Sequence, residues 1–376
     1  METLQEMRSG GVIDLTDSNP THCGFEYPSL PQSLGNTGAL GYDPDPLGLP
    51  EAREALAEYL RRKGKRIEAS QIVLTSSTSE AYSYLFKLLA NPGENFLIPT
   101  PGYPLLDHLL RLEALQPLPY PLSPEPGWPL DLNAVSSKIT PETRGLVVIT
   151  PHNPTGSALK PREEESLRGI CSQNHCALIM DEVFSDYIYG APPQQDSGHS
   201  ERVLTFKLGG LSKSLGLPQL KLSWILLDGP QETLRECREK LEFIADAYLS
   251  VNTPVQLGLR KLLETAPFFQ EQVMERLTAN RLFLGRELGR LKNKARLWPS
   301  EGGWYALVEI LGSPVRDTQL ALELLQKERV FVHPGEFYDF SRGTFWVLSL
   351  LPRKDAFEEG TRGICRYLEK MDQDLG

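Results

Sequence analysis

The chain has few cysteines, and no two of them are spaced as a redox or metal-binding motif. Five cysteines occur among 376 residues, without a C-x-x-C pair. This pattern argues against a disulfide framework or a zinc site and favours reduced thiols. The N-terminus lacks the apolar core of a secretory signal, and no apolar run is long enough to cross a bilayer. We therefore expect a cytoplasmic protein with no bound metal and no membrane partner.

Basic residues are also fewer than acidic residues. The sequence has 39 lysines and arginines against 49 aspartates and glutamates, which gives a formal net charge of −10. Such a balance argues against a nucleic-acid-binding surface, so no nucleic acid partner is expected. The apolar content of 40% and the charged content of 23% are ordinary for a globular protein with a substantial core. The length is sufficient for two domains.

What the sequence does contain is a series of short apolar runs separated by segments of helical periodicity. Runs of this kind are typical of strands that are buried on both faces of a mostly parallel sheet. They lie at residues 72–74, 96–98, 146–149, 177–180, 203–206 and 224–227. After about residue 230 the pattern is helical, and the last part alternates between strands at 304–310 and 345–350 and helices.

This order predicts an α/β protein with a three-layer αβα large domain and a smaller α+β domain. A change of composition near residue 253 suggests the boundary. We expect residues 1–40 to form an N-terminal arm and part of the small domain. Residues 41–253 would then form the large domain, and residues 254–376 the small C-terminal domain.

Polar turns follow five of the predicted strands. In open parallel sheets, ligands bind outside the carboxyl ends of the strands, so these turns should meet at one rim. They lie at residues 76–79, 101–104, 153–156, 181–184 and 209–213.

Lys213 is the most informative residue in these turns. It stands among glycines and serines directly after an apolar run. A lysine whose pKa is lowered by its surroundings can attack an aldehyde, and its amine can later shuttle a proton at a substrate carbon. We interpret Lys213 as the catalytic lysine that forms a Schiff base with pyridoxal 5′-phosphate. The alternative is an ordinary solvated lysine.

Two further residues suit the ring of that cofactor. Asp181 ends an apolar run and could keep the pyridine nitrogen protonated, so that the ring accepts electrons. Its alternative role is a helix N-cap. Asn153, in the segment 152–156, could donate its amide to the cofactor 3′-oxygen. Asn-Pro and Thr-Gly also make ordinary turns.

Other cofactor contacts are predicted at the ring face and at the phosphate. Tyr103 offers a flat face for stacking, although an isolated aromatic is often a core residue. Ser77 and Thr78 precede a helical segment, where backbone N–H groups and hydroxyls would suit a phosphate. Simple capping of that helix is the competing interpretation.

Together these residues resemble the class I/II aminotransferases of the fold-type I pyridoxal-phosphate enzymes, over nearly the whole chain. Tyr42 with residues 48–53, and the later segments 302–305 and 332–335, are also similar to that family. The resemblance implies an aspartate-aminotransferase-like fold and a homodimer. It implies that Tyr42 reaches the phosphate of the neighbouring subunit's cofactor. It also implies that Ser212 helps to bind the phosphate.

The sequence departs from the family pattern around the cofactor. Lys221 stands where the family usually has a phosphate-binding arginine, which keeps the charge but loses the bidentate fork. Phe184 occupies the place of a tyrosine whose hydroxyl bonds the cofactor 3′-oxygen. Gly210 stands where many relatives place a phosphate-binding serine.

The largest departure concerns the substrate. Val347 stands where many family members place an arginine that binds the substrate α-carboxylate. Arg353 is the nearest replacement, or else a surface arginine. On the resemblance, Ser18, Asn153 and Arg353 are the expected substrate-binding residues.

The predicted activity is transamination between an amino acid and a 2-keto acid. A pyridoxal-phosphate-dependent lyase or decarboxylase is the alternative, because Val347 and Phe184 change how a substrate is held over the ring. A third hypothesis is a transcription regulator that uses this fold to bind an effector. The family-like segment begins by about Ile13, so we do not expect a DNA-binding domain before it.

Overall fold

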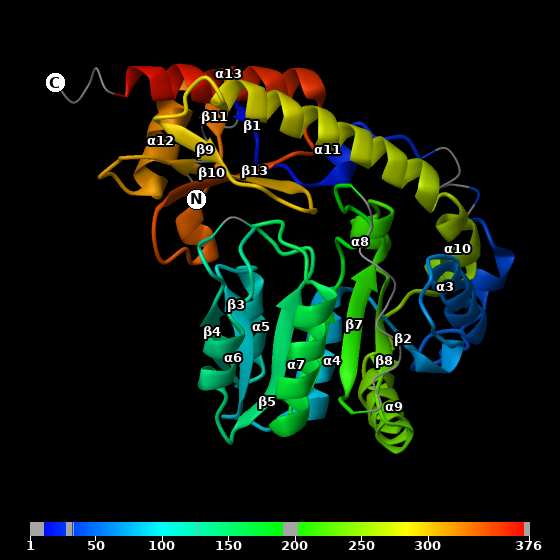
Figure 1. Ribbon diagram of the computed structural model, residues 1–376. Helices are drawn as coiled ribbons and strands as arrows, with labels where there is room; N and C mark the ends of the chain where they lie inside the picture. Colours follow the sequence, from blue (N-terminus) through cyan, green and yellow to red (C-terminus); the bar gives the residue numbers. More distant parts are fainter. Residues whose placement is uncertain (1–10, 28–31, 33, 126, 191–201, 372–376) are drawn as a thin grey trace.

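The computed structural model describes residues 11–27, 32, 34–125, 127–190 and 202–371 (Figure 1). A large domain is built on one sheet, and a smaller domain lies over the edge of that sheet where β7 leads into α8 (Figure 1). In the described part of the chain, no helix is both long and apolar enough to cross a membrane.

The large sheet has seven strands in the order β2-β8-β7-β6-β5-β3-β4 among the described residues. Only β8 is antiparallel to its neighbours, so β2, β3, β5, β6 and β7 all run the same way. The strands predicted from the apolar runs are confirmed. The bounds are β2 Ile72–Thr75, β3 Asn95–Thr100, β4 Gln116–Pro121, β5 Thr143–Ile149, β6 Ala177–Asp181, β7 Thr205–Gly210 and β8 Ser223–Asp228.

The strand β4 was not predicted, because prolines occupy every second position of its sequence. It pairs with β3 at the edge of the sheet. Proline lacks an N–H group and is therefore tolerated only where that group would face away from the ladder. The N–H groups of Gln116 and Leu122, on either side of the prolines, bond to the carbonyls of Glu94 and Thr100. The alternation therefore leaves the inward-facing donors in place.

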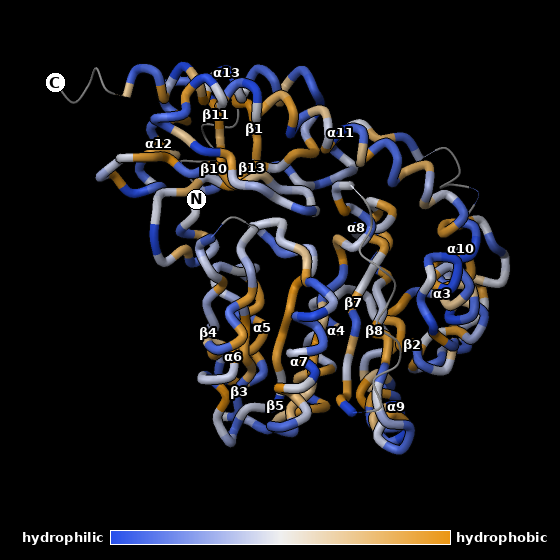
Figure 2. The backbone as a smooth tube through the Cα atoms, in the orientation of Figure 1, coloured by the Kyte–Doolittle hydropathy of each residue, from blue (hydrophilic) through white to orange (hydrophobic). Residues whose placement is uncertain are grey.

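Helices cover both faces of this sheet, as the three-layer prediction requires. One face packs against α4 (Thr78–Leu89), α5 (Leu105–Leu112) and α9 (Gln231–Asp246). The other face packs against α6 (Leu132–Lys138) and α7 (Pro161–Gln173), and beside them against α3 (Pro50–Arg62) and α10 (Thr253–Glu264). Figure 2 shows the apolar run of β5 in the middle of this layered structure.

In the described part of the chain, the small domain combines a second sheet with three α-helices. The long α11 (Ala266–Leu288) and α13 (Lys354–Lys370) pack together, and α12 (Asp317–Glu328) packs against α13. The sheet has the order β12-β13-β10-β9. A separate parallel pair joins β1 to β11, so the N-terminal segment lies with the C-terminal part of the chain. The bounds are β1 Ile13–Asp14, β9 Ala295–Leu297, β10 Tyr305–Ile310, β11 Val330–Phe331, β12 His333–Pro334 and β13 Thr344–Ser349.

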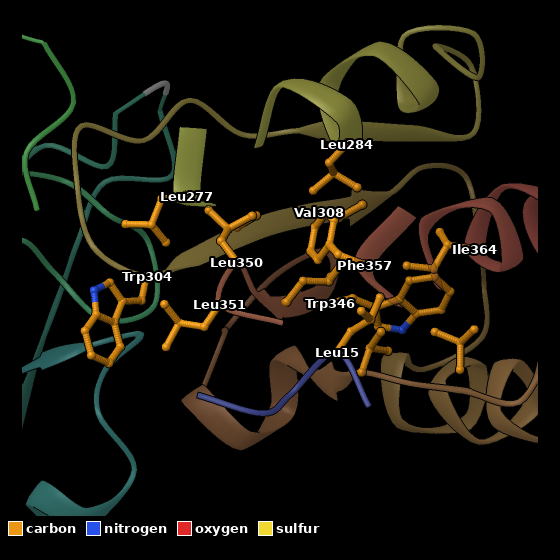
Figure 3. Packing of buried hydrophobic residues seen from close by; sticks show 14 of the residues in the cluster. Leu15, Leu277, Leu284, Trp304, Val308, Trp346, Leu350, Leu351, Phe357 and Ile364 are labelled. Carbon is orange, nitrogen blue, oxygen red and sulfur yellow. The ribbon is translucent and has the colours of Figure 1, made fainter. Parts of the chain in front are cut away.

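The core of the small domain draws on segments that are far apart in the sequence. Figure 3 shows Leu15 from the N-terminal segment close to Trp346 and Phe357. Trp304 and Leu277 lie at the other end of the same cluster (Figure 3). The predicted α+β character is confirmed, while the limits of the domains stay predictions.

Candidate active site

The five predicted turns meet at one rim of the large sheet, because the strands before them share a direction. Backbone hydrogen bonds fasten this rim to the small domain. The N–H of Gly102 donates to the carbonyl of Tyr338 at 3.0 Å. The carbonyl of Gly156 accepts from the N–H groups of Glu301 and Gly302 at 2.8 and 3.0 Å. The site therefore lies between the two domains.

Lys213 lies in the short helix α8 (Leu211–Ser214), directly after β7. Its Nζ is 4.8 Å from the ring centroid of Trp304 and 5.5 Å from that of Phe184. Its carbonyl accepts a hydrogen bond of 2.6 Å from the Tyr187 hydroxyl. Burial lowers the pKa of Lys213 to about 8, although the Asp181 carboxylate opposes this shift. The neutral form of the amine is therefore far more populated near neutral pH than in an ordinary lysine.

Asp181 ends β6 and is buried beside the same helix start. Its Oδ2 accepts a hydrogen bond of 3.0 Å from the Tyr82 hydroxyl, and its Oδ1 accepts one of 3.2 Å from the N–H of Val183. Burial raises the pKa of Asp181 to about 6, whereas these bonds and Lys213 lower it. The buried Asp181 and the half-buried Lys213 thus influence each other's charge at the rim.

Asn153 is buried in the turn that follows β5, and its Oδ1 has no hydrogen-bond partner. The preceding His152 has its Nδ1 2.9 Å from Oγ1 of Thr155, and its Nε2 is also without a partner. Burial lowers the pKa of His152 to about 3, so the ring is neutral. Gly156 closes the turn with φ of +72°. The turn therefore presents an amide with an unused oxygen in a buried position.

Three tyrosines lie close together where the large domain meets the small domain. They are Tyr103, Tyr305 and Tyr338. Burial raises the pKa of Tyr103 to about 12, and the charges of Asp181 and Tyr305 add to the shift. Tyr305 is half-buried, and burial raises its pKa, while a hydrogen bond with the Ser18 side chain lowers it. Burial and the proximity of Tyr305 and Tyr103 raise the pKa of Tyr338. The structure thus brings Ser18, Tyr103 and Asp181 into one region.

The start of α4 has the capping arrangement that was one of its two interpretations. The Ser77 Oγ accepts from the N–H of Glu80 at 3.1 Å, and the Glu80 carboxylate accepts from the N–H of Ser76 at 2.7 Å. Thr78 is the first residue of the helix. Capping is confirmed by these bonds, and the phosphate-binding role of Ser77 and Thr78 stays a prediction.

Three predicted site residues are exposed. Tyr42 is 73% exposed. Lys221 is exposed and has a left-handed backbone with φ of 52°. Arg353 is exposed at the start of α13, with its side chain near Gly24. Within the described ranges, no hydrogen bond or ion pair joins any of the three to Lys213, Asp181 or Asn153.

The departures at Val347 and Phe184 are buried apolar side chains. Val347 is fully buried in β13 opposite Leu307, and both belong to an apolar cluster with Trp298 and Phe345. Phe184 packs edge-on against Trp304, with ring centroids 5.5 Å apart. Neither position offers a polar group to a ligand, and an arginine at 347 would be buried among hydrocarbon.

Sequence reasoning missed two residues that support the site, Tyr82 and Tyr187. Tyr82 lies within the amphipathic helix α4, where a buried aromatic residue is indistinguishable from an ordinary core residue. Tyr187 follows Phe184 in an irregular segment and gives no periodic pattern. Their hydroxyls bond to Asp181 and to the Lys213 backbone, respectively. Only the packing of the folded chain shows these contacts.

Comparisons with known proteins show which family this chain is similar to. The family model for aminotransferase class I and II matches residues 29–347. The chain is 25% identical to glutamate-pyruvate aminotransferase AlaA of Haemophilus influenzae, over 98% of this chain and 93% of the relative. Its fold is similar to that of alanine aminotransferase from Pyrococcus furiosus, with a TM-score of 0.89, 24% identity, and coverage of 98% and 95%.

The fold is also similar to a mutant of aspartate aminotransferase from Thermus thermophilus, with a TM-score of 0.85 and 23% identity over 97% of this chain and 94% of that one. The aspartate-aminotransferase-like fold expected from the sequence is therefore confirmed. Because the family model spans most of the chain, this protein belongs to the aminotransferase class I and II family and is a transaminase.

Proposed function

We propose that this transaminase binds pyridoxal 5′-phosphate covalently through Lys213 and moves an amino group between an amino acid and a 2-keto acid. The observation that carries the proposal is the pairing of Lys213 with Asp181. Burial brings the pKa of the amine down to about 8 and that of the acid up to about 6. An amine with this pKa can attack an aldehyde near neutral pH, which an ordinary lysine does poorly.

The residues present fit that cofactor. The Asp181 carboxylate is buried with two neutral donors, the Tyr82 hydroxyl and the Val183 N–H. A protonated ring nitrogen beside it would supply a positive partner and restore the ionised acid. The Asn153 side-chain amide is buried at the same rim, and its N–H group can donate a hydrogen bond to the ring 3′-oxygen. We therefore assign Asp181 to the ring nitrogen and Asn153 to the 3′-oxygen.

When bound, pyridoxal phosphate supplies an electron sink for the carbon that loses its proton. Lys213 then has two tasks: it holds the cofactor, and after release its amine takes and returns the substrate proton. The rings of Trp304 and Phe184, at 4.8 and 5.5 Å from Nζ, surround this amine with apolar surface. Burial lowers the pKa of this amine and so raises the share of its neutral, proton-accepting form, although an aromatic face by itself attracts an ammonium ion.

The remaining cofactor contacts are assigned by chemistry and position. Tyr103 would cover one face of the ring, since it lies within electrostatic range of Asp181. We assign the phosphate to the start of α4 and to the residues around Lys213. Tyr42 would act from the second subunit of a homodimer, and its 73% exposure leaves it available for such a contact. The proposed phosphate-binding residues are Ser77, Thr78, Ser212, Lys221 and the partner's Tyr42.

We propose that the substrate is bound by Ser18, Asn153 and Arg353. Ser18 is linked to Tyr305 at the side of the site that faces the small domain. Arg353 is the proposed cation for the α-carboxylate, because Val347 offers none. Glutamate, alanine and pyruvate are the first substrates to test, since the AlaA relative is a glutamate-pyruvate aminotransferase. We place the protein in the cytoplasm, in agreement with its five free cysteines.

The experiment is a spectral titration of the purified holo-protein with a panel of amino acids. We expect the absorbance band of the lysine-bound cofactor to convert to that of pyridoxamine phosphate and to return when a 2-keto acid is added. Lys213→Ala should lack the band and the conversion. Lys240→Ala, at an exposed lysine of α9, is the matched control and should behave as wild type. Ammonia or carbon dioxide release without a keto acid would instead indicate a lyase or decarboxylase.

A further inference from the structure

Ser223 is a buried serine at the rim that no assignment above uses. It is the first residue of β8 and is 2% exposed. In the sheet it is paired with Thr75 of β2 on one side and with Gly210 of β7 on the other. Thr75 is followed by Ser77 and Thr78, and Gly210 is followed by Ser212. These are proposed phosphate-binding residues. Ser223 therefore lies between the start of α4 and the helix that carries Lys213.

The Ser223 side chain points to the face of the sheet on which α4 lies. Side chains alternate along a strand. In β8, Ile225 and Leu227 belong to the core shared with α4 and α9, whereas Trp224 and Leu226 pack with α3 and α10. By this alternation Ser223 faces the same side as Ile225, at the rim where α4 begins.

The polar groups at this place lack partners. In the described chain the Ser223 hydroxyl makes no hydrogen bond, and no acceptor binds the backbone N–H groups of Thr78 or Ser79 at the start of α4. The nearby Glu80 carboxylate is occupied by the N–H of Ser76 and by the hydroxyl of Ser250. A buried hydroxyl beside the free N–H groups of a helix start is a favourable place for an anion with several oxygens.

The lack of a side chain at Gly210 leaves space for the Ser223 hydroxyl on the neighbouring strand β8. The backbone of Gly210 is extended, with φ of −179°, a conformation that any residue can adopt. A Cβ at Gly210, however, would overlap the Ser223 hydroxyl oxygen and lie 3.0 Å from the Ser223 Cβ. The paired positions 210 and 223 therefore have room for one side chain between them, and in this chain it is the side chain of Ser223.

We propose that the Ser223 hydroxyl donates a hydrogen bond to the phosphate of pyridoxal 5′-phosphate, in the space that the absent side chain of Gly210 leaves. This inference rests on the proposed function. It adds a phosphate contact from β8, on the strand between the two segments that were assigned to the phosphate.

The first test compares two ligands on apoprotein. Dissociation constants of pyridoxal 5′-phosphate and of pyridoxal, which lacks the phosphate, are measured by quenching of tryptophan fluorescence. For Ser223→Ala we expect about a tenfold weaker affinity for the phosphorylated ligand, equivalent to about 1.4 kcal/mol, and less than a twofold change for pyridoxal. An equal loss for both ligands, or no loss for either, would overturn the proposal. The thermal midpoint of the apoprotein checks that the variant is folded.

The second test moves the hydroxyl across the strand pair. Gly210→Ser alone should weaken cofactor binding and lower the thermal midpoint, because it collides with Ser223. The double variant, with Gly210→Ser and Ser223→Gly together, should lack the collision. Its affinity for pyridoxal 5′-phosphate should recover most of the wild-type value and exceed that of Ser223→Gly alone. If the double variant binds no better than Ser223→Gly, the proposal is wrong. If wild-type apoprotein does not bind the cofactor at all, it is the proposed function that fails.

Discussion

The Tyr82 hydroxyl donates a hydrogen bond of 3.0 Å to Oδ2 of Asp181, and both side chains are buried. Tyr82 belongs to α4 and Asp181 to the end of β6, so the contact exists only when the helix layer is packed on the sheet. Burial alone would favour the neutral acid. The tyrosine is one of the groups that lower the pKa of Asp181 against that effect.

Removing this hydroxyl should weaken cofactor binding. For Tyr82→Phe we expect the affinity of the apoprotein for pyridoxal 5′-phosphate to fall about tenfold, since hydrogen bonds to charged groups contribute roughly 1.5–3 kcal/mol. Fluorescence titration measures the dissociation constant. Tyr120→Phe is the matched control, because that buried hydroxyl bonds to the carbonyl of Val147 at 2.8 Å instead of to Asp181. Equal losses in both variants would show that Tyr82 acts only through stability.

The reactivity of Lys213 should follow its lowered pKa. In apoprotein, reductive methylation of Lys213 should rise with pH with a midpoint near pH 8 and level off about one pH unit higher, because only the neutral amine reacts. Exposed Lys240, whose pKa is raised by its hydrogen bond to Glu236, should reach its plateau above the ordinary range of lysine. Peptide mass spectrometry after timed labelling separates the two sites.

The same labelling tests whether Asp181 acts on Lys213. The carboxylate raises the pKa of the lysine, so Asp181→Asn should remove that influence and move the midpoint to a lower pH. A midpoint that moves upward, or a wild-type midpoint near that of Lys240, would contradict the electrostatic coupling between the two residues.

Much of the site could be predicted from the sequence because its chemistry lies in local segments. Lys213, Asp181 and Asn153 each follow an apolar strand, and parallel strands bring their carboxyl ends to one edge regardless of the details of packing. Tyr82 and Ser223 could not be predicted, since their roles depend on which face of a helix or strand they occupy. The edge strand β4 was missed for a related reason: its prolines are permitted only by its place in the sheet.

The role of Arg353 depends on its distance from a bound substrate, which no sequence pattern fixes. If it binds the α-carboxylate, Arg353→Ala should raise KM for amino acids about tenfold or more with little change in kcat. An amine with the same side chain but no carboxylate should be unaffected. Arg362→Ala is the matched control, at an exposed arginine of the same helix that bonds to Glu358. If both arginine variants behave as wild type, Arg353 is a surface residue.

Gly156 joins the Asn153 turn to the small domain, and a side chain there should loosen the contact. Its φ is +72°, and an added Cβ would lie 2.6 Å from the Ser300 Cβ and 2.7 Å from the Gly302 carbonyl oxygen. The backbone conformation and the overlap together predict a loss of about 2–4 kcal/mol for Gly156→Ala.

The loss should be local, because the Gly156 carbonyl accepts the N–H groups of Glu301 and Gly302, two residues before Trp304. We expect a lower thermal midpoint and faster hydrogen exchange at residues 150–158 and 301–304, with α7 unchanged. Gly169→Ala, at an exposed helix position where a Cβ meets nothing, should instead gain about 0.5–1 kcal/mol. If Gly156→Ala is as stable as Gly169→Ala, the turn does not hold the two domains together, and the placement of Trp304 over Lys213 must depend on other contacts.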